Sequence, residues 1–298
     1  MSPTLKGTIA GLVAAICYGL IPLFTIPLKN GEAAHQLSDC SIMFYRFALA
    51  TVIIAVLMLI TRRSFKITRG ELVTLTYLAF LSDGSALFLI DGYNYLSSGV
   101  ATTIHFMYPV VTTIMMMVFY NEARKVSTLL AVLLAVGGVG VLSWQSNGET
   151  SLHGVIIELI SACCYAFYLI RVNRSRVRNM DGMKLTFYVM GIGALIFGAE
   201  ALRQDEFQMI TTSVQASHLL LLGIVCTVVT NLCLVMAVQR IGSTMTAVLG
   251  ALEPLTAVAL GCLLMGEDIT LNVVLGICLI IPSVIIIIFT RAKHSSAA

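Results

Sequence analysis

The side chains with the clearest chemical potential in this sequence are acidic residues inside long apolar stretches. Asp83 and Glu253 each lie near the middle of such a stretch. Ionisable groups in hydrocarbon are costly, so they are rarely idle. Either carboxyl group could bind a substrate amine, or carry a proton, because desolvation favours the neutral form of an acid. Glu253 also precedes Pro254, which lacks a backbone donor, so its side chain could instead satisfy freed backbone groups.

Three further polar side chains lie within apolar stretches. Arg46 could hold a substrate carboxylate through paired hydrogen bonds. It could equally extend to the outer interface, or pair with Asp39 or Asp91. His105 titrates near neutral pH, which suits proton coupling, but a neutral, hydrogen-bonded histidine is the favoured interpretation. Asn231 adds an amide that could also contact a substrate.

Motifs for catalysis or for metal and nucleotide binding are absent from the sequence. The eight cysteines fall in apolar stretches or at the start of one and form no Cys-x-x-Cys pair. There is no Gly-x-Ser-x-Gly, His-Glu-x-x-His or ATP-binding motif. We therefore expect no catalytic residue, no metal and no cofactor, which argues against an enzyme and against an ATP-driven pump.

The elements that must position these side chains are membrane-spanning helices. The chain is 58% hydrophobic and only 11% charged, with a mean hydropathy of +0.94, whereas soluble domains carry roughly 25% charged residues. A run of about 20 apolar residues spans the bilayer as a helix. Such runs predict ten spans, near 7–28, 40–61, 72–91, 98–119, 127–144, 154–172, 186–202, 218–238, 243–264 and 270–290.

The distribution of charge predicts the orientation of these spans. With the N-terminus in the cytoplasm, 15 of the 18 Lys and Arg residues fall in inside loops and two in outside loops. This asymmetry is the positive-inside pattern, and it predicts that both termini are cytoplasmic. Basic loops beside membrane spans, without interleaved aromatic residues, give no reason to expect a nucleic-acid partner.

An internal repeat divides the chain into two halves. Residues 7–18 align with residues 154–165 at a spacing of 147, and a second set aligns at a spacing of 145: Ser98, Pro109 and Glu122 with Ser243, Pro254 and Glu267. We expect a five-helix repeat over 1–146, a second over 152–291, and a cytoplasmic tail over 292–298. Because five is odd, the second repeat must be inverted, as in secondary transporters with a midplane substrate site.

Two pairs of residues occupy matching positions in the two repeats. Pro109 and Pro254 are helix-breaking residues at matching depth, which points to a binding site and to gating, although plain kinks are an alternative. Tyr18 and Tyr165 also match, and could form two aromatic walls of a site or pack in the core.

Glu122 and Glu267 are the acidic members of the repeat. Each lies in a turn just before an expected helix. A carboxylate there complements the helix dipole and the exposed amides, so we expect these two acidic turns to be structural.

The sequence resembles the EamA family of the drug/metabolite transporter superfamily over nearly its whole length. Two segments carry the resemblance, Tyr108-Pro109 to Asn121-Glu122 and Leu252-Glu253-Pro254 to Gly266-Glu267, of which the second is the closer. The first departs in having Tyr before Pro and Asn before Glu. The resemblance implies ten helices, no cofactor, and transport, often export, of amino acids or other metabolites. It does not fix the substrate.

Together these features predict a secondary transporter that exports a small metabolite by alternating access, in the inner membrane of a bacterium. The expected substrate contacts are Tyr18, Arg46, Asp83, His105, Tyr165, Asn231 and Glu253, with protons as a candidate coupling ion. The partners are the substrate and the bilayer, and Gly7-x-x-x-Gly11 permits helix packing or dimerisation. A non-transporting sensor or partner subunit, or a lipid-modifying membrane enzyme, is the alternative.

Overall fold

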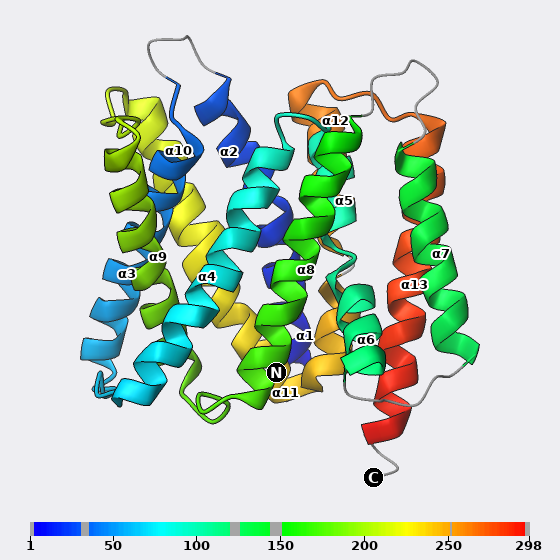
Figure 1. Cartoon of the computed structure of the whole chain (residues 1–298), viewed down its shortest axis with the longest axis horizontal. Helices are drawn as coiled ribbons and strands as arrows, with labels where there is room; N and C mark the ends of the chain where they lie inside the picture. The colour runs from blue at the N-terminus through cyan, green and yellow to red at the C-terminus, as the bar shows by residue number, and fades with distance from the viewer. Residues whose placement is uncertain (1–2, 31–35, 120–125, 144–150, 251, 296–298) are drawn as a thin grey trace.

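A computed structural model describes residues 3–30, 36–119, 126–143, 151–250 and 252–295 (Figure 1). These ranges contain helices and their connections and no strand. The helices in chain order are α1 (Pro3–Gly19), α2 (Ile21–Lys29), α3 (Asp39–Ile60), α4 (Arg69–Gly92), α5 (Ser98–His105), α6 (Tyr108–Phe119), α7 (Val126–Ser143), α8 (Leu152–Arg174), α9 (Gly182–Arg203), α10 (Ser213–Gly223), the π-helical segment η2 (Ile224–Val229), α11 (Thr230–Gly250), α12 (Leu252–Met265) and α13 (Leu271–Ser295).

The described chain is long and apolar enough to cross a bilayer several times. Seven stretches qualify by length and hydropathy: Thr4–Lys29, Asp39–Ile60, Arg69–Gly92, Ser98–Phe119, Leu152–Val172, Gly182–Arg203 and Ser213–Leu234. Leu252–Met265 and Leu271–Ile286 are shorter apolar helices. The chain is therefore an integral, multi-pass membrane protein, and the count of ten spans stays a prediction.

Polar side chains mark where several helices begin. The Ser38 hydroxyl accepts from the N–H of Ser41 at the start of α3. A reciprocal pair of hydrogen bonds between Thr68 and Glu71 caps α4, and Asp181 accepts two N–H groups at the start of α9. These contacts satisfy the amide groups that a helix leaves free at its N-terminus.

Helices from the two parts of the chain alternate in space. The helices run side by side between an upper and a lower edge in Figure 1. The most extensive contacts join α1 to α11, α7 to α13, α3 to α9, α4 to α8, α4 to α9 and α5 to α12. Each of these pairs combines an element before residue 144 with one after residue 150. The two predicted repeats therefore interlock rather than pack as separate bodies.

Two apolar stretches have helix bounds that differ from those we expected. The stretch 98–119 splits into α5, which ends at His105, and α6, which begins at Tyr108. The expected helix 243–264 is wrong in its boundaries, because α11 continues without a loop to Gly250 and α12 begins at Leu252. His105 and Gly250 are 145 residues apart, the spacing of the repeat. Pro109 is the second residue of α6 and Pro254 the third residue of α12, and a proline cannot donate to the helix ladder.

Large apolar side chains cover the outer surface. Leu195 is 75% exposed and Leu263 is 77% exposed. In water such exposure would be costly, but hydrocarbon is as apolar as the side chains themselves. The inner faces of the helices, by contrast, enclose a polar cavity.

Candidate functional site

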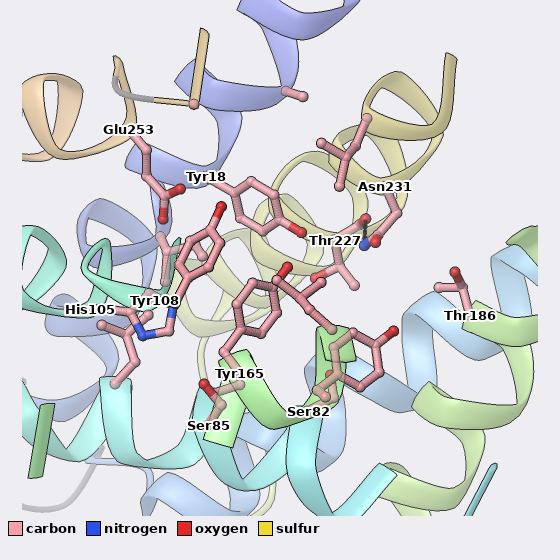
Figure 2. A pocket seen from close by; sticks show the side chains of 18 of the residues that line it. Tyr18, Ser82, Ser85, His105, Tyr108, Tyr165, Thr186, Thr227, Asn231 and Glu253 are labelled. Atoms are coloured by element: carbon pink, nitrogen blue, oxygen red, sulfur yellow. Dashed lines mark hydrogen bonds between the residues drawn. The ribbon is translucent and has the colours of Figure 1, made fainter. Parts of the chain in front are cut away.

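A cavity of about 320 Å³ lies between the helices. Its volume falls in the range of about 300–1,000 Å³ that small-molecule sites occupy. Both predicted repeats contribute to it, because the lining residues come from α1, α2, α3, α4, α5, α6, α8, α9, η2, α11 and α12. The aromatic and polar lining consists of Tyr18, Arg46, Ser82, Ser85, His105, Tyr108, Tyr165, Tyr168, Thr186, Thr227, Asn231, Thr246 and Glu253 (Figure 2).

The cavity brings together most of the side chains that the sequence singled out. Six of the seven expected substrate contacts line it: Tyr18, Arg46, His105, Tyr165, Asn231 and Glu253. Asp83 does not. Pro109 and Pro254 are not lining residues either, but each directly follows one, Tyr108 and Glu253 respectively.

Arg46 is buried and turned into the cavity. Its side chain is among the lining residues, and its Nε donates to Oγ1 of Thr227 over 2.9 Å. The expected alternative partners are engaged elsewhere: Asp39 pairs with Lys29 at 2.6 Å, and Asp91 accepts from Asn94 at 3.0 Å. The other guanidinium N–H groups of Arg46 have no hydrogen-bond partner among the described residues, and their forked arrangement suits a carboxylate.

The partner of Arg46 lies in the π-helical turn. Thr227 Oγ1 also donates to the carbonyl of Leu222 over 3.1 Å, and Asn231 Nδ2 donates to the carbonyl of Thr227 over 2.7 Å. A π turn widens the helix and changes which side chains face inward, and it occurs often at functional sites. Here it presents Thr227 and Asn231 to the same cavity.

Glu253 faces the cavity without a protein partner. It lies in the first turn of α12, and the described residues offer it no hydrogen bond or ion pair. Figure 2 shows its carboxylate directed toward the rings of Tyr18 and Tyr108. The alternative that Glu253 satisfies freed backbone groups therefore finds no hydrogen bond in support. The N-terminal end of α12 favours negative charge at this position.

Tyrosine rings form one wall of the cavity. The Tyr165 ring lies 4.8 Å from that of Tyr108 in an edge-to-face arrangement, and 5.8 Å from that of Tyr168 in a stacked one. Sequence reasoning found Tyr165 but missed the other two. Both carried a signal, because Tyr108 is the repeat counterpart of Glu253 and Tyr168 lies one helical turn after Tyr165.

His105 is held by a pair of serines. Its Nδ1 lies 2.8 Å from Ser161 Oγ. Ser161 Oγ also donates to the carbonyl of Ser85 over 2.7 Å, and Ser85 Oγ donates back to the carbonyl of Ser161 over 2.8 Å. This reciprocal contact joins α4 to α8. The geometry supports the favoured interpretation of a hydrogen-bonded histidine.

Asp83 lies behind the cavity wall. Its side chain is 1% exposed, and neither carboxylate oxygen has a hydrogen-bond partner in the described chain. It contacts Gly193 of α9, where an added Cβ would collide with the carboxylate, and it interacts electrostatically with Arg46. Asp83 is therefore placed to act on Arg46 rather than to contact a ligand.

Glu267 makes the structural contact expected of it, but with an unexpected partner. Its Oε1 accepts a 2.7 Å hydrogen bond from the backbone N–H of Ser98 at the start of α5. The two residues are 169 positions apart in the sequence. It thus caps a helix of the first part of the chain rather than the helix that follows it. The matching residue, Glu122, lies outside the described residues.

No group of three or more His, Cys, Asp or Glu side chains in the described chain is arranged to hold a metal ion. The cysteines are all free thiols in the part of the chain that the structure describes.

Comparisons with known proteins give the family. The profile of the EamA-like transporter family matches residues 5–144 and again residues 152–289. An "Uncharacterized inner membrane transporter", YicL of Salmonella typhimurium (strain LT2), is 25% identical, with both chains covered in full. An "Uncharacterized transporter" of Clostridium kluyveri is 22% identical over 94% of this chain and 92% of its own.

A solved structure supports the fold. A solved chain described as "Crystal structure of protein" superposes on this chain with a TM-score of 0.68. The match covers 97% of this chain and 98% of the other, at 12% sequence identity. The likeness concerns the fold alone. Because the family profile covers most of the sequence, the chain belongs to the EamA-like transporter family, and so to transporters rather than enzymes.

Proposed function

We propose that this family member carries a small zwitterionic metabolite, of the amino-acid class, across the membrane through the cavity. One observation carries the proposal. Arg46 and Glu253 face the same enclosed space, and they are the one basic and the one acidic side chain, histidine aside, among the described residues that line it. Among the described residues, the guanidinium donates one hydrogen bond, from Nε to Thr227, and the carboxylate has no hydrogen-bond or ion-pair partner. A ligand with one negative and one positive group would satisfy both.

Each wall of the cavity has a role in this scheme. Arg46, oriented by Thr227, binds the substrate carboxylate through charge-assisted hydrogen bonds. Glu253 binds the amine. The rings of Tyr108 and Tyr165 contact the rest of the substrate, and their π faces attract its cationic group. Of the expected contacts, Asp83 becomes a positioning residue for Arg46.

We further propose that the site is exposed alternately to the two sides by rocking of two inverted five-helix repeats, 1–146 and 152–291. Three observations support this scheme. The family profile matches the chain twice. The contact of α1 with α11 has a counterpart in that of α8 with α4. The C-terminal residues of α5 and α11, His105 and Gly250, share the repeat spacing and both line the cavity, beside which Pro109 and Pro254 would serve as hinges.

Topology and direction complete the proposal. Figure 1 places the α3–α4 turn, the α8–α9 loop and the end of α13 at one edge, and these segments are rich in Lys and Arg. We assign that edge, both termini and the tail 292–298 to the cytoplasm. The family resemblance favours export, and the inner-membrane name of one relative favours that membrane. Glu253, Asp83 and His105 are the groups through which protons would couple.

A non-transporting sensor or partner subunit is the second candidate function. It would need no enclosed site with contributions from both parts of the chain, whereas the cavity is lined by residues of eleven elements of the described chain, from α1 to α12. The charged and aromatic lining therefore favours transport. A lipid-modifying enzyme is disfavoured by the family assignment.

Uptake into vesicles tests the function. The purified full chain is reconstituted in liposomes and offered a panel of labelled amino acids and related metabolites. We expect saturable flux of at least one zwitterion, reduced by more than tenfold in Glu253→Gln and Arg46→Gln, and unchanged in Arg62→Gln, which alters an exposed loop residue. Absence of flux for the whole panel, with the protein folded, would contradict the proposal. Flux that stays the same when the pH gradient is collapsed would exclude proton coupling.

A further inference from the structure

A second pocket lies at the edge of the molecule, away from the central cavity. It opens between the α3–α4 turn and the α8–α9 loop, which lie together at the lower edge of Figure 1. Three cationic side chains line it: Arg63, Arg176 and Lys184. Ser64 and Asn179 add hydrogen-bond donors to the same pocket. The proposed transport function uses none of these residues.

The electrostatics of this pocket favour an anion. The N-termini of α4 and α9 both lie at it, and a helix N-terminus carries partial positive charge. The two acidic residues there are already engaged. Glu71 accepts from the N–H of Thr68 over 2.6 Å, and Asp181 accepts from the N–H groups of its own helix and pairs with Arg63. The positive charge of the pocket is therefore only partly compensated.

Arg176 is the cation with free donors. It is exposed, and no hydrogen bond or ion pair engages its side chain within the described residues. Its guanidinium packs against Gly70 in the first turn of α4, where any larger residue would displace it. A cation beside a helix N-terminus is unfavourable unless an anion joins them. The planar fork of an arginine suits a phosphate group, which accepts several hydrogen bonds at once.

The surroundings of the pocket indicate where that phosphate comes from. The helix surfaces beside it expose large apolar side chains: Ile60 is 72% exposed and Val73 is 71% exposed. A molecule with its phosphate in the pocket and its apolar chains along these surfaces would neutralise the positive charge of the pocket and cover the apolar side chains. We propose that this pocket binds the headgroup phosphate of an anionic phospholipid from the surrounding leaflet.

Lipid titration of the purified full chain in detergent tests the proposal. Thermal stability is followed while phosphatidylglycerol, phosphatidylcholine or inorganic phosphate is added. We expect saturable stabilisation by phosphatidylglycerol alone. Arg176→Gln should weaken the apparent affinity about tenfold, because a charge-assisted contact is lost. Arg178→Gln is the matched control, since Arg178 is an exposed arginine of the same loop that does not line the pocket.

Each other outcome would overturn the proposal. Equal weakening in Arg176→Gln and Arg178→Gln would indicate attraction to surface charge in general. Equal stabilisation by inorganic phosphate would indicate a free anion rather than a lipid. Equal stabilisation by phosphatidylcholine, or none by phosphatidylglycerol, would indicate that the pocket has no preference for an anionic headgroup. Transport activity plays no part in the readout, so this result is independent of the proposed function.

Discussion

Arg46 Nε donates a 2.9 Å hydrogen bond to Thr227 Oγ1, and this contact joins the middle of α3 to the π-helical turn before α11. The two residues are 181 positions apart and belong to different predicted repeats. The bond fixes a buried cation at the cavity surface. The π turn that supplies the hydroxyl therefore takes part in forming the proposed substrate site.

Replacement of Thr227 by Val tests this relationship. Valine keeps the shape of the side chain but removes the acceptor, which leaves one N–H of Arg46 without a partner. Loss of a hydrogen bond to a charged group costs about 1.5 kcal/mol, so we expect the half-saturating substrate concentration to rise about tenfold. The control is Thr51→Val, which removes a hydroxyl of α3 that donates to the carbonyl of Phe47 in its own helix. Equal effects of the two variants would refute a specific role for Thr227.

The tyrosine rings that line the cavity lead to the prediction that the ring of Tyr165 contributes more to substrate affinity than its hydroxyl does. Tyr165 contacts the rings of Tyr108, Tyr168 and His105. In Tyr165→Phe the ring stays, so we expect flux within about threefold of the wild type, whereas Tyr165→Leu should lose roughly tenfold in apparent affinity, because each aromatic contact contributes about 0.5–1.5 kcal/mol. Saturation curves in vesicles measure both. If the leucine variant matched the phenylalanine variant, the rings would not contact the substrate.

The cap that Glu267 forms on α5 predicts a loss of stability. Glu267→Ala leaves the N–H of Ser98 without its acceptor, and loss of a helix cap costs about 1 kcal/mol. We expect a lower thermal unfolding midpoint in detergent, with a smaller loss in Glu267→Gln, whose amide oxygen can still accept. Glu206→Ala, at an exposed position, serves as control. Midpoints that do not differ between Glu267→Ala and Glu206→Ala would show that the cap contributes nothing.

Gly193 tests the packing of Asp83. A methyl group at this position would collide with the Asp83 carboxylate and lie 2.9 Å from the Phe47 ring. We expect Gly193→Ala to destabilise the protein by about 1–3 kcal/mol, as overpacking does. Gly140→Ala is the matched control, because nothing lies within 4 Å of its added methyl group. The measurement is again the thermal midpoint. A midpoint for Gly193→Ala no lower than that of the control would mean that α9 can move away at little cost.

The depth of the polar side chains along their spans could be predicted from the sequence, but the direction in which each side chain points around its helix could not. Counting residues along an apolar run placed Asp83 and Glu253 near the middle of their spans, and both are buried. It did not separate Glu253, which lines the cavity, from Asp83, which lies behind the wall. Helices that are apolar all round have no polar face to reveal which side is inward.

The helix breaks show a second limit. The matched prolines predicted irregular backbone at two places, and α6 and α12 do begin there. The π turn at Ile224–Val229 had no such marker, because it contains no proline or glycine and its residues are mostly apolar and β-branched, as in many spans. Thr227 was therefore missed, although it orients the arginine that was found.

The central claim is that Arg46 and Glu253 bind opposite charges of one substrate, and analogue competition in vesicles tests it most directly. Uptake of a labelled zwitterion is challenged with an analogue that lacks the amine and with one that lacks the carboxylate. We predict that the intact zwitterion competes best in the wild type, that Glu253→Gln loses only the preference for the amine, and that Arg46→Gln loses only the preference for the carboxylate. If both variants kept the ranking of the wild type, the account would be contradicted.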